Sequence, residues 1–71
     1  MNQDTFSFVI YMIHACSNRW HLPPSEVYQK MTRADCINSY LVAHYDVLHT
    51  LGTGYLVDDV REYLERRGIS V

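Results

Sequence analysis

The 71-residue sequence is long enough for one domain only, and a chain of this size buries about 60% of the surface that its unfolded form exposes. Hydrophobic residues make up 48% and charged residues 20%, a composition that argues against a disordered chain. The formal net charge is −2 and the basic residues are scattered, which argues against a nucleic-acid-binding module.

The first predicted helix begins at Asp4, whose carboxylate can accept the free backbone N–H groups of a first turn, and runs to about Trp20. Its apolar residues recur at spacings of three and four and therefore share one face: Phe6, Val9, Ile10, Ile13, Cys16 and Trp20. A second apolar row consists of Phe8, Met12 and Ala15. A helix this apolar lies at the centre of the fold or is buried in an oligomer. The run is too short and too polar to span a membrane.

A second, short helix is predicted after Pro23, with Pro24 at its first position and an end near Met31 to Arg33. Asp35 can cap a third helix, and Gly52 is expected to close it in the left-handed conformation. The apolar face of this third helix is predicted to contain Ile37, Leu41, His44, Leu48 and Leu51, with Tyr40 and Val47 beside it.

Tyr55 to Arg67 is predicted to form the fourth helix, which Gly68 closes. Its inward residues are Leu56, Val60, Tyr63 and Leu64. Asp58 and Asp59 are expected in its first turns and Arg66 and Arg67 in its last, where the helix dipole favours these charges. The predicted fold is all-α, a compact four-helix domain of orthogonal or bundle-like type spanning residues 1–71 and forming a homodimer.

The stretch "YDVLHTLGTGYLVDD", residues 45–59, holds the candidate site. Asp46 and His49 lie three positions apart on a helix, so the carboxylate could orient the imidazole as a general base. Nothing selects a nucleophile among Ser17, Ser39, Thr50 and Thr53. The structural interpretation is that His49 and Thr50 hydrogen-bond the last carbonyls of the third helix at a joint between two helices. If the stretch binds a ligand or partner instead, the candidate residues are Tyr45, Asp46, His49, Thr50, Tyr55 and Asp59.

Metal and DNA sites are not expected. The closest pairs of candidate metal ligands, Cys16 with His21 and His44 with His49, are five positions apart, which does not match the spacing of structural zinc sites. The segment "DCINSYLVAHYD", which would be the recognition helix of a helix-turn-helix, contains two aspartates and no arginine or lysine. The two cysteines do not form a disulfide framework, so we expect a reduced, cytoplasmic protein without cofactor or metal.

The segment "YLVAHYDVLHTLGTGYLVDDVREYLERRG" resembles the bacterial family catalogued as domain of unknown function 3791. The residues that carry the resemblance are Tyr45, Asp46, Leu48, His49, Thr50, Gly52, Tyr55, Val57, Asp59, Tyr63 and Gly68, together with "EVY" at residues 26–28. The resemblance implies an all-helical bacterial cytoplasmic protein that serves as a partner or antitoxin-like component, and it transfers no catalytic residue.

Two classes of function follow from the sequence. The first is a non-enzymatic protein–protein interaction module, an antitoxin-like or accessory component of a two-gene system, whose partner is a second copy or a small protein. Neither nucleic acid nor a membrane is expected as a partner. The alternative is a small enzyme or ligand-binding protein that uses the neighbourhood of Tyr45, Asp46, His49 and Tyr55.

Overall fold

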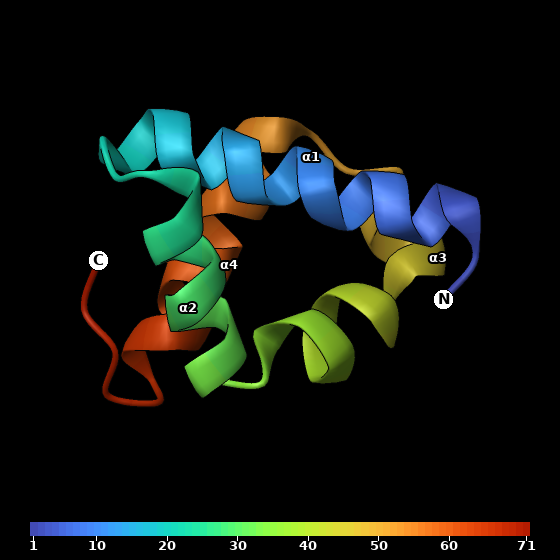
Figure 1. Cartoon of the computed structure of the whole chain (residues 1–71). Helices are drawn as coiled ribbons and strands as arrows, with labels where there is room; N and C mark the ends of the chain where they lie inside the picture. The colour runs from blue at the N-terminus through green and yellow to red at the C-terminus, as the bar shows by residue number, and fades with distance from the viewer.

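The computed structural model covers residues 1–71 and contains five helical segments and no strand (Figure 1). The segments are α1 (Gln3–Trp20), α2 (Pro24–Arg33), the π-helix η1 (Ile37–Val42), α3 (Tyr45–Leu48) and α4 (Thr53–Glu65). The prediction of an all-α fold is therefore confirmed. None of these helices combines the length and the apolar character needed to cross a lipid bilayer.

Helix α1 covers one side of the fold, and α2, α4 and η1 all pack against it (Figure 1). Its inward face buries Val9, Met12, Ile13 and Cys16. Figure 1 shows α2 descending from the end of α1, while η1 and α3 return beneath α1 towards its beginning. Tyr45 on α3 then meets Phe8 on α1 edge to face, with the ring centroids 5.5 Å apart.

The prediction that Asp4 caps α1 is wrong. Asn2 is the cap, and its side-chain oxygen accepts a hydrogen bond from the backbone N–H of Thr5 at 2.8 Å. Asp4 lies within the first turn. The end of α1 is set by His21, which adopts the left-handed conformation with φ 58° and donates its backbone N–H to the carbonyl of Ser17. Helix α2 begins as predicted, with Pro23 as the cap and Pro24 at the first position.

The predicted third helix is two segments rather than one. The prediction that Asp35 caps this helix is wrong, because Cys36 is the cap of η1. Asp35 precedes it with a φ of 54°, in the left-handed region. A π-helix has more residues per turn than an α-helix, so side chains that follow η1 are rotated away from the face that 3.6-residue periodicity gives. Leu41 and Leu48 are buried as expected, but His44 and Leu51, predicted on the same face, are exposed, and Val47 beside them is 63% exposed.

Helix α4 begins two residues earlier than predicted and buries Leu56, Val57, Val60 and Leu64. Asp58 and Asp59 consequently lie in its second turn, and no acidic residue is in the first. Arg66 and Arg67 follow the last helical residue, Glu65, so neither lies in the last turn.

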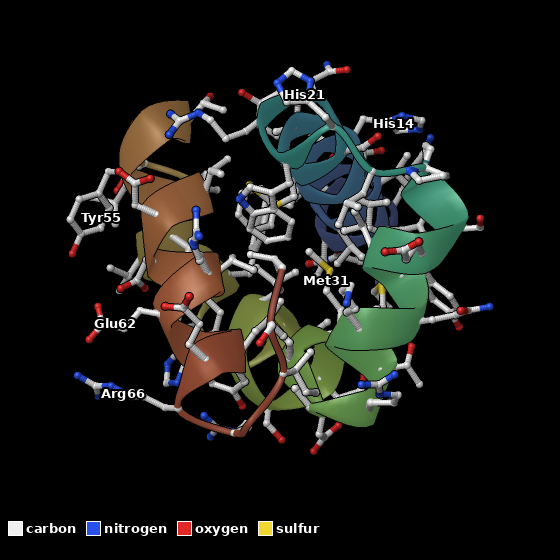
Figure 2. All side chains as sticks on the ribbon, turned by 90° about the vertical axis from the view of Figure 1, so that its left-hand side faces the viewer. His14, His21, Met31, Tyr55, Glu62 and Arg66 are labelled. Atoms are coloured by element: carbon white, nitrogen blue, oxygen red, sulfur yellow. The ribbon has the colours of Figure 1, made fainter.

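The C-terminal segment, residues 66–71, runs along the outside of the domain between α2 and α4, and Ile69 is its one buried residue (Figure 2). Gly68 adopts φ 78°, as predicted for the residue that closes the helix. The backbone N–H of Ile69 then bonds the carbonyl of Leu64, and the Ile69 side chain is buried in the core. Lys30 Nζ on α2 donates to the carbonyl of Ser70 at 2.8 Å. The segment therefore connects α2 to the end of α4.

The core consists of side chains from every helical segment, and Met31 points into it from α2 (Figure 2). No buried side-chain nitrogen or oxygen lacks a hydrogen-bond partner. The accessible surface is 4365 Å², close to the ~4,600 Å² expected for a folded monomer of this mass. The fold therefore closes its core without a partner.

Candidate functional site

His49 and Tyr45 form the centre of the stretch that the sequence singled out. Their rings are stacked, with centroids 4.5 Å apart and planes inclined by 14°. His49 Nδ1 also lies 2.8 Å from the backbone oxygen of Tyr45, so in the tautomer with a proton on Nδ1 it donates a hydrogen bond there. The ring of Phe8, on α1, contacts the ring of Tyr45. The imidazole is thereby fixed against α3 rather than directed at a second polar side chain.

The Asp46–His49 pair required by the catalytic interpretation is not formed. Asp46 is exposed and has no side-chain hydrogen bond or ion pair. Its carboxylate therefore does not orient the imidazole. Thr50, a proposed nucleophile, donates its hydroxyl to the carbonyl of Val47 at 2.7 Å. Both His49 and Thr50 thus bond backbone carbonyls of the short helix α3.

Gly52 does not close a helix in the left-handed conformation, and this prediction is wrong. Its φ of −70° and ψ of 148° are extended, and the residue is the cap of α4. The chain reverses within residues 49–52, and α4 starts at once with Thr53. The Thr53 hydroxyl is hydrogen-bonded to the hydroxyl of Tyr11, which ties the start of α4 to α1.

The two remaining candidates, Tyr55 and Asp59, lie elsewhere on the molecule. Tyr55 is 62% exposed and points outward from α4 (Figure 2). Asp59 accepts a hydrogen bond from the hydroxyl of Tyr40 on η1. The Tyr40 ring contacts the Tyr63 ring at 5.1 Å, and the Arg67 guanidinium lies 3.5 Å from the centroid of Tyr63. Asp59 therefore joins α4 to η1 instead of facing His49.

Asp58 forms an ion pair with Arg19 at 3.0 Å between α4 and α1. Both side chains are more than half exposed, so the pair contributes little to stability. Arg19 borders a shallow hollow of about 560 Å³ between these helices, which is also lined by His14 and Asn18. Asp58 and Asp59 therefore interact with side chains of α1 and η1, and their positions are not explained by the dipole of α4.

Sequence reasoning missed a second hollow, which lies between α1, α2 and η1 and which we call the α1–α2–η1 groove. It has a volume of about 360 Å³ and is lined by ten residues, seven of them hydrophobic: Met1, Phe6, Val9, Ile10, Ile13, Tyr28, Thr32, Asp35, Ile37 and Asn38. Four of the apolar side chains remain exposed, namely Met1 by 66%, Phe6 by 56%, Ile10 by 40% and Tyr28 by 52%. The groove could have been predicted from the apolar face of α1, which is too wide for a small core to cover completely.

The cysteine thiols are buried and unreactive. Cys16 and Cys36 are both free and fully inaccessible to solvent. The pKa of each thiol is raised from 9.0 to about 12, chiefly by burial and, for Cys16, also by the nearby Cys36. No group of three or more histidine, cysteine, aspartate or glutamate side chains is placed to hold a metal ion.

The fold and its surface define a small all-helical domain with an open apolar groove. A family model matches residues 7–67, and the chain belongs to that family, described as "Protein of unknown function (DUF3791)". No curated protein and no solved structure shows significant similarity to the chain.

Proposed function

We propose that the protein is a non-enzymatic protein–protein interaction module that binds through the α1–α2–η1 groove. The observation that supports this function is the exposure of Phe6, Ile10 and Tyr28 around one concave, mostly apolar surface. Apolar side chains that gather at one place on a small domain mark a binding surface, whereas single exposed ones do not. The partner is a second copy of the chain or a small protein, and the setting is an antitoxin-like or accessory role in a bacterial two-gene system.

The exposed apolar groups are not needed to complete the fold. The core is closed and its polar atoms are satisfied, while Phe6 and Ile10 lie on the outer side of the same helix that buries Val9 and Ile13. A partner that covers Phe6, Ile10 and Tyr28 removes apolar area from water at about 25 cal/mol per Å². Part of this gain offsets the entropy lost on association.

An experiment in the source cells tests this function. The tagged chain would be recovered and its companions identified by mass spectrometry, alongside light scattering of the purified protein. Ile10→Asp places a charge in the groove, and Val47→Asp is the control because Val47 is equally apolar, 63% exposed and outside the groove. We expect a stoichiometric partner, or twice the 8.3 kDa chain mass, with the control and the parent but not with Ile10→Asp.

Two results would contradict the proposal. One is recovery of a monomer without any stoichiometric companion. The other is an association that Ile10→Asp leaves unchanged while the variant remains folded by circular dichroism. In either case weight moves to the alternative function, a ligand-binding protein or enzyme that uses Tyr45, Asp46, His49 and Tyr55. Ligand-induced stabilisation that His49→Ala removes would support that alternative.

A further inference from the structure

We propose that the occupant of the α1–α2–η1 groove is an amphipathic α-helix of a partner protein, which carries a lysine or arginine beside its apolar stripe. This inference rests on the proposed function, because it names the kind of partner that the same surface takes. It is carried by the shape of the groove, the chemistry of its lining and the position of its single charged side chain.

The length of the groove matches a helix of about two turns. Phe6, Ile10 and Ile13 follow one another along α1 at spacings of four and three, which spans about 10 Å at 1.5 Å per residue. Tyr28 and Thr32, four positions apart on α2, which descends from α1, line another side of the groove. A helix that binds in an apolar groove presents anchors at positions i, i+3 or i+4, and i+7, which cover the same distance.

The lining favours a helix over an extended peptide. Seven of the ten lining residues are hydrophobic, and the groove walls are helices, so they offer no sheet edge to which a strand could add. An extended peptide would leave backbone N–H and C=O groups facing apolar side chains without partners. A helix satisfies these groups internally, and it can bury its side chains in the groove without that cost.

The charge of the partner follows from the polar side of the groove. The polar lining residues, Thr32, Asp35 and Asn38, follow one another from the end of α2 into η1. Asp35 is the only charged side chain among the lining residues, and it is exposed. One carboxylate oxygen accepts a hydrogen bond from Ser39, and no lysine or arginine pairs with the carboxylate. A basic side chain at this edge of the bound helix complements Asp35.

A second copy of the chain fits the groove less well. Phe6, Ile10, Tyr28 and Met1 together expose about 400 Å², roughly half of the ~800 Å² that each partner buries in an interface of standard size. A two-fold symmetric dimer would also place the same concave surface opposite itself. Two grooves that face each other leave their hollows unfilled, whereas the convex surface of a helix fills one.

Two synthetic peptides of 14 residues test the inference against the full chain. Both carry the same leucine stripe at positions i, i+4 and i+7; one is flanked by lysine and the other by glutamate. Binding would be followed through the backbone amide signals of the ¹⁵N-labelled protein. We expect the lysine peptide to shift the signals of Phe6, Ile10 and Tyr28, and to bind roughly two- to five-fold more tightly than the glutamate peptide.

Four variants separate the contributions of charge and apolar contact. Asp35→Asn should reduce the preference for the lysine peptide to near unity. Asp46→Asn changes the net charge equally, but Asp46 lies outside the groove, so the preference should persist. Ile10→Asp should abolish binding of both peptides, whereas Val47→Asp should leave it unchanged.

The inference is overturned if neither peptide shifts the groove signals, or if the preference for lysine responds equally to Asp35→Asn and Asp46→Asn. It is also overturned if light scattering shows a dimer that Ile10→Asp dissociates, because a second copy then occupies the groove. That last result leaves the proposed interaction function intact. The proposed function itself fails only when no association in the source cells depends on the groove.

Discussion

The imidazole of His49 lies flat against the phenol ring of Tyr45, one helical turn before it, and Phe8 of α1 contacts the edge of the same phenol ring. These ring contacts connect the short helix α3 to α1. The stretch that looks most reactive in the sequence therefore holds two helices together at a reversal of the chain.

Replacing His49 by alanine removes the ring stack and the hydrogen bond from Nδ1 to the Tyr45 carbonyl. Because the imidazole is exposed, we expect the free energy of unfolding to fall by only about 0.5–1.5 kcal/mol. Urea denaturation followed by circular dichroism measures the change. His14→Ala, at an exposed position of α1, is the control and should leave stability nearly unchanged. An unaltered midpoint for His49→Ala would show that the stack does not hold α3 in place.

The hydrogen bond from Tyr40 to Asp59 joins η1 to α4 and should contribute measurably to stability. We expect Tyr40→Phe and Asp59→Asn each to lower the free energy of unfolding by about 1 kcal/mol. The double variant should be less destabilised than the two single changes added together, because both remove one interaction. Denaturant titration of all four proteins gives the coupling energy. Strict additivity would mean that the two side chains do not interact in solution.

Replacing Gly52 and Gly68 by alanine should change the free energy of unfolding by different amounts. Gly68 has a φ of 78°, which strains any residue with a Cβ, so Gly68→Ala should cost about 1 kcal/mol. Gly52 has a φ of −70° and open space around the position of a Cβ, but alanine is a poorer helix cap than glycine, so the two effects offset each other and Gly52→Ala should be nearly neutral. Thermal denaturation compares the two. A loss of stability for Gly52→Ala as large as that for Gly68→Ala would contradict the extended conformation of Gly52.

The buried thiols predict a loss of stability in alkali. The folded-state pKa of Cys16 and Cys36 is about 12, above the 9.0 of an exposed thiol, so the folded state retains protons that the unfolded state releases. Stability from this source is fully present below pH 9 and falls as the pH rises towards 12, with a slope of about 1.4 kcal/mol per pH unit for each thiol.

The measurement is the free energy of unfolding from urea titrations at several pH values between 8 and 11. The comparison uses the double variant Cys16→Ala, Cys36→Ala, which lacks the thiols and isolates their contribution. Its stability should be lower at neutral pH but should decline less steeply with pH. Equal slopes for parent and variant would be inconsistent with thiols that stay protonated in the fold.

Local sequence signals predicted much of the helical framework, and three-dimensional packing accounts for the differences. Prolines at 23 and 24 fixed the start of α2, because the first helical position tolerates a missing N–H. Asn2 and Asp4 are both capping residue types, so the choice between them depends on the full first turn rather than on residue type. The break between η1 and α3 contains no proline or glycine, so the sequence did not indicate that the predicted third helix is interrupted there.

The candidate site was predictable only in part for the same reason. The helix-end positions of His49 and Thr50 follow from the chain order, and their bonds to backbone carbonyls are local. The partners of Asp58 and Asp59 come from α1 and η1, and no local pattern identifies Arg19 or Tyr40. The groove arises from the relative placement of three helices, which the sequence leaves open.

The bond from Lys30 to the carbonyl of Ser70 joins residues 40 positions apart, and Ile69 fills the core beside it. Residues 69–71 make one backbone hydrogen bond to a helix, from Ile69 to the carbonyl of Leu64, so this end of the chain is expected to open before the centre of α1 unfolds. When it opens, α2 loses its tether to the end of α4. Tyr28 and Thr32 belong to α2, so each opening of this segment should also let the groove change its width. Hydrogen exchange of the Ile69 amide measures how often the segment opens. A helix bound in the groove would hold α2 in place and should therefore slow hydrogen exchange at Ile69, although it does not contact that residue.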